Sequence, residues 1–504
     1  MTGTLLTLLV AVPLAGTGIT AFARADTRWP IRLLVTVLAA NLAAGVALVT
    51  TTRDGTVLAH GVGGWTSGIA IPFVADTLAA LMVTVTGLLT LVCVLFALAS
   101  GTGRLRLFAP LVLALTAGVN GALLTADVFN LFVFIEVMLL PSYGLFILAR
   151  RQQGHPAAVG GSRLYVTFNL FVSTVLLAGI ALLYGTAGTV NLAELAGAAA
   201  DSPLVAAATA ICLFALAMKA AVVPTYGWLG RAYPSTSPAV TALFSGLHTK
   251  VAIYAIYRIY AVVFDGDQRY LWIGLVVFSA TMLVGVLAAV GADTMRSILA
   301  FHMVSQIGYI LLGVALFTPA GLTAGIFYLL HHMIVKASLF LSTGAIETHY
   351  GTGRLDRLRG IVRREPVLAV SFGLAALSLA GLPPLSGFVA KLTLIMAAAD
   401  AGHLAVVAIT LAVSLITLLS MLKIWNAVFA ASPPPDSPDD PAAGTGQLLT
   451  AERTTVKTSL VVPAAILAAV TVCLGLGGEF LLGLASTAAD GLLDTSSYLE
   501  AVRR

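Results

Sequence analysis

The sequence predicts an all-α polytopic membrane protein. Hydrophobic residues make up 59% of the chain and charged residues only 10%, and the mean hydropathy is +1.00. A soluble protein of 504 residues carries more charge and less apolar side-chain surface. A membrane-spanning helix needs roughly 20 mostly apolar residues, and about 14 such segments follow one another along this chain.

The expected spans are distributed over the whole sequence. They cover residues 4–23, 31–51, 72–99, 107–125, 128–149, 164–184, 203–223, 238–264, 271–290, 295–317, 321–346, 366–400, 404–430 and 459–485. Proline interrupts the seventh span at Pro224 and the twelfth at Pro383-Pro384. Because proline removes a helix hydrogen bond and clashes with the preceding turn, we expect both helices to be broken. Unwound backbone at membrane depth survives only where protein or a water-filled cavity satisfies it.

The two breaks predict an internal repeat. Lys219 precedes its break, whereas Lys391 follows its own break five spans later. This reversed order is what an inverted-topology repeat gives. We therefore expect N-terminal transmembrane helices over 1–106, a first repeat over 107–264, a second repeat over 265–430, a disordered cytoplasmic linker over 431–457, and a final transmembrane helix with its tail over 458–504.

The distribution of charge predicts the orientation in a cell membrane. The net charge is +5, and the basic residues concentrate in alternate loops, as at Arg24–Arg32, Arg104–Arg106 and Arg354–Arg364. By the positive-inside rule these loops are cytoplasmic. With an even number of spans, both termini then lie outside. Basic residues spread over loops in this way indicate lipid contact and no nucleic-acid partner.

The sequence carries no pattern for a cofactor. Cys93, Cys212 and Cys473 are isolated in apolar segments, without the spacing of an iron–sulfur or zinc site. Neither a phosphate-binding loop nor a Rossmann glycine pattern is present. We therefore expect no metal and no cofactor, so the driving force must be an ion gradient or a partner protein.

Charged side chains inside the apolar segments are the strongest functional signal. They are Glu136, Lys219, Lys250, Lys336 and Lys391. A charge near the bilayer midplane costs at least a few kcal/mol, so it is tolerated mainly where it pairs, faces water or moves a proton. This set predicts an ion-conducting path.

Glu136 and Lys219 are the expected switching pair. Burial disfavours the charged form of each group, and a nearby opposite charge favours it. Approach or separation of the pair therefore moves a proton toward or away from Lys219. Two structural alternatives stay open: Glu136 could be a counter-ion that locks two helices, and Lys250 could merely extend its ammonium toward the membrane surface.

Histidines extend the expected path. His332 and Lys336 are four residues apart and lie on one helical face. Histidine titrates near neutrality and suits a proton relay, although a buried histidine held by a hydrogen bond is the alternative. His248 is a weaker candidate. Further polar groups in or beside the apolar segments are His302, Ser305 and Gln306, which could extend the path or hold helices together, and Lys423, Asp76 and Arg258, which we expect to be interfacial anchors.

Four segments carry a family resemblance: Asp127–Glu136, Met218–Pro224, Ser237–Val251 and Gly381–Lys391. They resemble the antiporter-like membrane subunits of respiratory complex I, membrane-bound hydrogenases and Mrp-type Na⁺/H⁺ antiporters. The resemblance extends from about the third to the thirteenth span. The Asp127–Glu136 run is most similar to the D subunits of Mrp antiporters.

The resemblance implies 14 helices with two inverted five-helix repeats. It implies that Glu136 and Lys219 switch, that Lys250 connects and that Lys391 is terminal. His332 and Lys336 match the eleventh-helix positions that link the halves. Many relatives have histidine at Tyr226, and several have Pro-Asp at Gly230-Arg231, so the cytoplasmic proton entrance is the least transferable feature.

Three functions fit to different degrees. The first is a proton-translocating subunit of a multisubunit Na⁺ or other monovalent cation/H⁺ antiporter, with further antiporter subunits as partners. The alternative is a proton-pumping subunit of a complex I-like NADH:quinone oxidoreductase or a hydrogenase, which uses the same residues. A carrier for an organic solute predicts a roomy midplane pocket with aromatic or arginine contacts, and a row of lysines fits that poorly.

Overall fold

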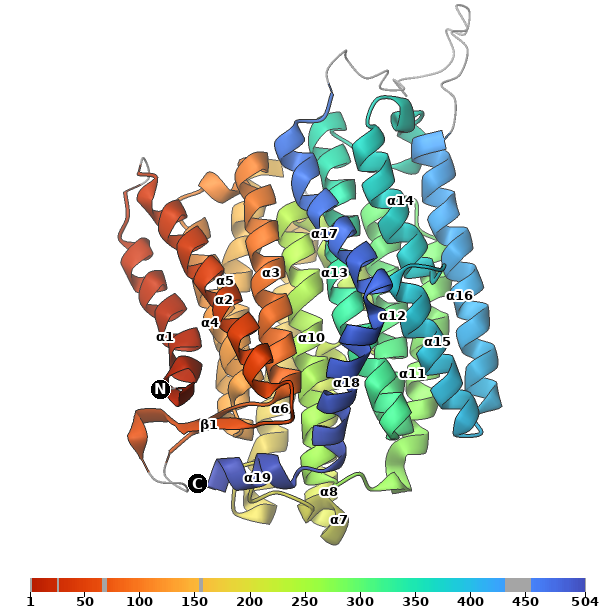
Figure 1. Ribbon diagram of the computed structural model, residues 1–504. Helices are drawn as coiled ribbons and strands as arrows, with labels where there is room; N and C mark the ends of the chain where they lie inside the picture. The colour runs from red at the N-terminus through yellow and green to blue at the C-terminus, as the bar shows by residue number, and fades with distance from the viewer. Residues whose placement is uncertain (1, 25–26, 66–69, 154–156, 431–454, 504) are drawn as a thin grey trace, which may run out of the picture.

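The protein is a bundle of long, upright helices (Figure 1). The computed structural model describes residues 2–24, 27–65, 70–153, 157–430 and 455–503. The helices before the first break are α1 (Thr2–Ala21), α2 (Trp29–Thr52), α3 (Thr77–Ser100), α4 (Phe108–Leu124), α5 (Val128–Gln153), α6 (Ala157–Ala187), α7 (Ala198–Asp201) and α8 (Pro203–Lys219). Those after it are α9 (Gly227–Ala232), α10 (Pro238–Val263), α11 (Leu271–Val290), α12 (Met295–Leu316), α13 (Pro319–Tyr350), α14 (Pro366–Ala380), α15 (Ser386–Asp400), α16 (Leu404–Ile424), α17 (Thr458–Leu476), α18 (Gly478–Leu493) and α19 (Ser496–Arg503).

The helix lengths confirm a polytopic membrane protein. Among the described residues, 11 helices are long and apolar enough to cross a membrane. Three shorter apolar helices, α4, α8 and α14, stand beside them in the bundle. The all-α class is therefore confirmed, while the number of 14 spans stays a prediction.

Both predicted breaks are present. The first lies between Lys219 and Gly227, and the second between Ala380 and Ser386. The seventh span was expected to continue to residue 223, but its helix ends at Lys219 because Ala221 has a left-handed backbone, with φ 64°. Side chains replace part of the lost helix bonding: Trp228 Nε1 donates to the Met218 carbonyl at 3.1 Å, and Ser378 Oγ accepts from the Gly387 amide at 3.2 Å. Protein groups thus satisfy unwound backbone at membrane depth.

Two of the predicted spans differ from expectation. The predicted last span over 459–485 divides near Gly477 into α17 and α18. The third predicted span begins too early, since residues 72–75 form a strand. This strand, β2 (Pro72–Ala75), pairs antiparallel with β1 (Leu58–Gly61). The hairpin lies near the short helix α19 at the lower end of the bundle (Figure 1).

Helices α10, α12 and α13 form the buried centre. Every residue of α10 from Ala239 to Val263 is buried, and so is nearly all of α12 and of α13 up to Ile346. Helix α13 packs against α3, α10, α12, α14, α15, α17 and α18. Polar groups on these three helices are therefore shielded from lipid by the surrounding helices.

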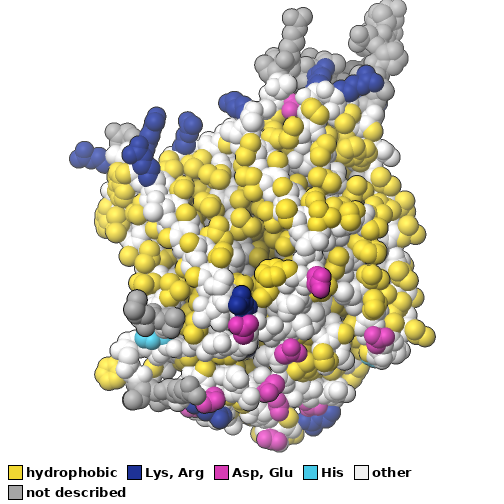
Figure 2. Space-filling model, viewed as in Figure 1, with side chains coloured by type: hydrophobic (Ala, Val, Ile, Leu, Met, Phe, Trp, Pro, Cys, Tyr) yellow, Lys and Arg dark blue, Asp and Glu magenta, His cyan; other side chains and the backbone are white. Residues whose placement is uncertain are grey.

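The surface agrees with a membrane orientation. Hydrophobic side chains cover the middle of the visible face, Lys and Arg gather at its upper end, and Asp and Glu lie mainly in its lower half (Figure 2). Both termini lie toward the lower end (Figure 1), as an even number of spans requires. Most of the predicted linker, residues 431–454, lies outside the described residues. Its described end is held by the Val456 amide, which donates to Glu365 Oε1 at 2.6 Å.

Candidate functional site

The site begins at Glu136 on α5 and Lys219 at the end of α8. Lys219 is 2% exposed, and Glu136 is half-buried. Glu136 acts electrostatically on Lys219, but their charged atoms do not come within 4.0 Å, the limit for an ion pair. The Glu136 carboxylate accepts a hydrogen bond from Ser173 Oγ instead, and Lys219 Nζ donates to Asn169 Oδ1 at 3.3 Å. Glu136 and Lys219 are therefore close enough to interact electrostatically but do not form an ion pair, and we call this arrangement the open pair.

Helix α10 carries the next two groups. Lys250 is completely buried, and its Nζ donates to the Ser245 carbonyl at 2.6 Å and to Thr249 Oγ1 at 3.1 Å. This contradicts a lysine that reaches the membrane surface. His248 lies closer to the path than expected: its Nδ1 is 2.8 Å from Tyr165 Oη, and Lys219 acts on it electrostatically.

His332 and Lys336 on α13 occupy the centre of the molecule. Both side chains are completely buried. Neither ring nitrogen of His332 has a hydrogen-bond partner among the described residues, which argues against a histidine fixed by such a bond. Lys336 Nζ donates to the Leu299 carbonyl at 3.0 Å. Lys250 from the first predicted half acts electrostatically on both groups.

The second predicted half continues the row to Lys391 on α15. Lys391 is 4% exposed, and its Nζ donates to the Ala380 carbonyl at 2.9 Å within the second break. The ammonium also lies over the Tyr309 ring, 5.3 Å from the centroid. His302 on α12 is acted on by both Lys336 and Lys391, and Lys391 also acts on His331.

All six predicted site residues lie within the helix bundle, five of them buried and Glu136 half-buried, and we call this set the row. In chain order they are Glu136, Lys219, Lys250, His332, Lys336 and Lys391. Glu136 acts electrostatically on Lys219, and Lys219 acts on His248, which lies two residues before Lys250 on α10. Lys250 acts on His332 and Lys336, and Lys336 and Lys391 both act on His302. A row of protonatable groups that are mutually coupled and shielded from lipid can pass protons along the membrane plane.

Several hydroxyl and amide partners were not predicted. Tyr165, Asn169 and Ser173 on α6 contact His248, Lys219 and Glu136. In the second half, Ser420 Oγ lies 2.9 Å from His302 Nε2, and Ser386 Oγ lies 2.8 Å from His331 Nδ1. Tyr165, Asn169 and Ser173 are four residues apart and therefore lie on one helical face. This spacing is the sequence signal that could have revealed them. The serine partners come from helices distant in sequence, so no local pattern reveals them.

Two of the three predicted anchors are not at an interface. Arg258 and Asp76 form a buried ion pair of 2.5 Å, with exposed fractions of 2% and 6%. Tyr498 of α19 covers the guanidinium, which lies 4.5 Å from the ring centroid. Burial raises the pKa of Tyr498 well above its ordinary value, so the phenol stays neutral beside the pair. Lys423 is exposed, as expected, and donates to the carbonyls of Val290 and Ala292 at 2.9 Å each.

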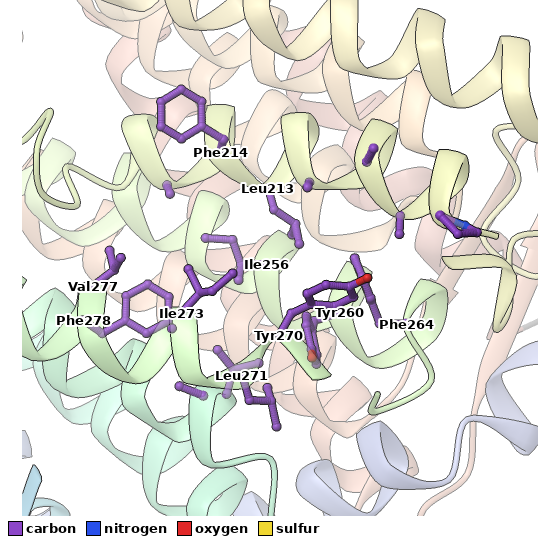
Figure 3. Close-up of a pocket in the computed structure, with 18 residues that line it drawn as sticks. Leu213, Phe214, Ile256, Tyr260, Phe264, Tyr270, Leu271, Ile273, Val277 and Phe278 are labelled. Carbon is purple, nitrogen blue, oxygen red and sulfur yellow. The ribbon is translucent and has the colours of Figure 1, made fainter. Parts of the chain in front are cut away.

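One described cavity, lined by apolar side chains, lies apart from the row. It has a volume of about 520 Å³ and opens between α8, α10, α11 and α12, where Leu213, Phe214, Ile256 and Phe278 line it (Figure 3). No Lys, Arg, Asp or Glu is among its lining residues. A charged or strongly polar solute would find no partner there, which argues against the organic-solute carrier. Within the described part of the chain, no group of three or more His, Cys, Asp or Glu side chains could hold a metal ion.

Known proteins are similar to this chain in sequence and in fold. The family of NADH:quinone oxidoreductase/Mrp antiporter transmembrane subunits matches residues 125–417. The D subunit of a Na⁺/H⁺ antiporter from Alkalihalophilus pseudofirmus is 38% identical over 447 residues, which is 87% of each chain. A chain of the Mrp complex from Dietzia sp. DQ12-45-1b is 56% identical, with a TM-score of 0.94 over 99% of both chains.

A more distant structure shares the architecture. A chain of respiratory complex I from Thermus thermophilus is 26% identical, with a TM-score of 0.74 over 96% of this chain and 100% of that one. The family match covers more than half of the sequence, and the antiporter relatives match nearly all of it. The chain therefore belongs to the NADH:quinone oxidoreductase/Mrp antiporter family of membrane subunits, in the branch of the Na⁺/H⁺ antiporter D subunits.

Proposed function

We propose that this chain is the proton-translocating subunit of a multisubunit monovalent cation/H⁺ antiporter in the cell membrane. It is a transporter subunit, and it works with other antiporter subunits in one complex. The observation that carries the proposal is the set of buried protonatable groups from Lys219 to Lys391, with the half-buried Glu136 beside Lys219. Such a row is costly in a membrane unless it conducts.

The first step takes place between Glu136 and Lys219. When the carboxylate approaches the ammonium, the charged form of Lys219 is favoured, and when it withdraws, burial favours release of the proton. The hydrogen bonds of Glu136 with Ser173 and of Lys219 with Asn169 support a withdrawn arrangement of the pair. His248, on which Lys219 acts electrostatically, is the proposed acceptor of this proton.

Like charges move the proton through the centre. Lys250 and Lys336 act on one another and both act on His332, so a proton on one disfavours a proton on the next. Arrival at Lys250 therefore favours departure from Lys336 toward His302 and Lys391. Lys391 lies at the second break, where the helix is unwound, and serves as the terminal group.

The cation takes a separate route in the assembly. Among the described residues no group of three or more His, Cys, Asp or Glu side chains could hold a metal ion, and the row itself consists of cationic and neutral groups apart from Glu136. A sodium ion prefers oxygen ligands with negative charge, so a lysine row repels it. The antiporter subunits match at 38–56% identity and the complex I chain at 26%, which favours cation exchange over redox-driven pumping.

Transport by the intact antiporter tests the proposal. The complex is expressed with all its subunits, and cation-dependent proton movement is followed in inverted membrane vesicles. We expect Glu136→Ala and Lys219→Ala to abolish exchange while the complex still assembles. Lys423→Ala is the matched control, because this exposed lysine lies outside the row. Full exchange by both row variants would overturn the assignment.

A further inference from the structure

One face of α6 contacts two members of the row, Glu136 and Lys219, and also His248. Tyr165, Asn169 and Ser173 are spaced by four residues and therefore lie on one side of the helix. Their exposed fractions are 0%, 1% and 7%. A buried polar side chain costs free energy unless it finds a hydrogen-bond partner. Three such side chains on one face of an otherwise apolar span therefore indicate that each has a specific partner.

Each member of this face contacts a different group. Ser173 Oγ donates to the Glu136 carboxylate, Asn169 Oδ1 accepts from Lys219 Nζ at 3.3 Å, and Tyr165 Oη lies 2.8 Å from His248 Nδ1. The order along α6 thus repeats the order of the proton path. The partners come from α5, α8 and α10, so α6 is the element that brings all three into register.

The face is held rigidly. Asn169 Nδ2 donates to the Tyr165 carbonyl at 2.9 Å, which turns Oδ1 toward Lys219. Ser142 Oγ lies 3.1 Å from Tyr165 Oη and donates to the Leu139 carbonyl at 2.6 Å. The Tyr165 ring stacks on Phe146 with centroids 4.5 Å apart. Fixed partners of this kind preorganise the groups that they contact.

The spacing explains why the pair is open. Four residues of α-helix rise by about 6 Å, so Asn169 and Ser173 hold their two partners at different levels. The Glu136 carboxylate and the Lys219 ammonium stay beyond 4.0 Å of each other. Ser173 and Asn169 are uncharged. When Glu136 and Lys219 leave them to form an ion pair, no unpaired charge stays behind on either partner.

We propose that Tyr165, Asn169 and Ser173 are positioning residues that hold Glu136 and Lys219 apart and align Lys219 with His248. This inference rests on the proposed function, since it assigns a role within the same proton path. Without Ser173, Glu136 loses its alternative partner and rests on Lys219. Without Asn169, Lys219 loses its alternative hydrogen-bond partner and forms an ion pair with Glu136. Either change stabilises the closed pair, and proton release becomes slower.

Single variants in the full complex test this step. A hydrogen bond to a charged group contributes enough that its loss changes a rate by on the order of tenfold. We expect Ser173→Ala and Asn169→Leu to slow exchange about tenfold, and Tyr165→Phe, which keeps the ring stacking, to slow it by a smaller factor. Ser173→Thr restores the hydroxyl and keeps exchange within about twofold of the unsubstituted complex.

Thr174→Ala is the matched control. Thr174 neighbours Ser173 on α6, but it is exposed and its hydroxyl donates to the Leu170 carbonyl at 3.0 Å within the helix. We expect exchange to be unchanged in this variant. The amount of intact complex is measured in the same vesicles, so that a rate is always compared at equal assembly.

Infrared difference spectroscopy adds a second measurement. The carboxyl band of Glu136 would not shift in a Ser173 variant if Ser173 contributed only to packing. The carboxyl band of Glu136 is identified as the band lost in Glu136→Gln. We expect Ser173→Ala to shift this band because its hydrogen-bond partner is gone, and Thr174→Ala to leave it in place. An unshifted band, or exchange at the unsubstituted rate in both Ser173→Ala and Asn169→Leu, overturns the positioning role.

The proposed function and the positioning role fail in different ways. If Glu136→Gln itself exchanges normally, the proposed function fails and the positioning role with it. If Glu136→Gln is inactive while Ser173→Ala and Asn169→Leu transport normally, only the role of α6 is overturned. Should Asn169→Leu not assemble, Ser173→Ala with its infrared band decides the matter alone.

Discussion

Lys219 in the first predicted half and the two lysines Lys336 and Lys391 in the second are held by different means. In the first half, Lys219 contacts the side chain of Asn169 and has a carboxylate nearby, Glu136. In the second half, Lys336 and Lys391 donate to backbone carbonyls at 3.0 Å and 2.9 Å. No described Asp or Glu forms an ion pair with either of these two lysines.

This difference indicates a division of labour. A carboxylate that can approach or leave is a switch, and a side-chain partner can be exchanged by rotation. A backbone carbonyl within a helix or at its broken end is fixed, so the second half relays charge mainly through like-charge repulsion and its histidines. We infer that the first half starts the transfer and that the second half responds to it.

A second pair in the molecule shows what a permanent contact looks like. Asp76 and Arg258 are joined at 2.5 Å, are both buried, and are covered by Tyr498. Glu136 and Lys219 have the same opposite charges but are held apart by neutral partners. The first pair fixes α3 to α10 and α19, whereas the second can change. Buried opposite charges alone therefore do not identify a switch.

His332→Asn gives the largest expected effect. This imidazole is acted on by Lys250 from one half and Lys336 from the other, and no hydrogen bond from the described residues fixes it. Loss of a group that transfers protons slows a reaction by on the order of 100-fold or more. Cation-dependent proton movement in inverted vesicles measures it, with His403→Asn as control, since that histidine only precedes α16. Normal exchange would mean that the halves communicate by another route.

Lys391→Arg sharpens the role of the second half. Arginine keeps the positive charge but does not release its proton in the physiological range. If Lys391 is only a structural cation, the arginine variant transports; if it relays protons, both Lys391→Arg and Lys391→Met slow exchange, by roughly tenfold or more. The same substitutions at Lys423, which is exposed, are expected to have no effect on exchange.

Asp76→Asn is expected to reduce stability and spare transport. Removing one partner leaves the buried Arg258 guanidinium without a carboxylate, a change that costs about 3–5 kcal/mol in folded proteins. The melting temperature of the purified complex measures the loss. Exchange per assembled complex should stay within about twofold. A stable Asp76→Asn complex with abolished exchange would place this pair in the proton path.

Ser420→Ala gives the smallest effect. The hydroxyl is one partner of His302, at 2.9 Å from Nε2, and His302 is acted on by two lysines regardless of it. Loss of one neutral hydrogen bond corresponds to a factor of roughly 2–10, and we expect the lower end. Exchange rates in the same vesicles measure it. An effect as large as that of His332→Asn would mean that the second half, too, depends on side-chain positioning.

The sequence predicted the main architecture because its signals are local. Apolar segments of spanning length and prolines within two of them are visible in single stretches of chain, and the broken helices at Pro224 and Pro383-Pro384 are present. The β1–β2 hairpin and the division of the last predicted span at Gly477 were not predicted. Strand pairing between residues 58–61 and 72–75 depends on a register between separate segments.

The sequence by itself determined which ionisable groups enter the membrane, since a charge within an apolar run is conspicuous wherever it occurs. Only the tertiary structure decided which of them meet, because helices distant along the chain pack side by side. Asp76 and Arg258 are separated by 182 residues and form an ion pair, whereas Glu136 and Lys219 lie near one another and remain apart. Partners are a property of packing, and packing is set by the whole bundle.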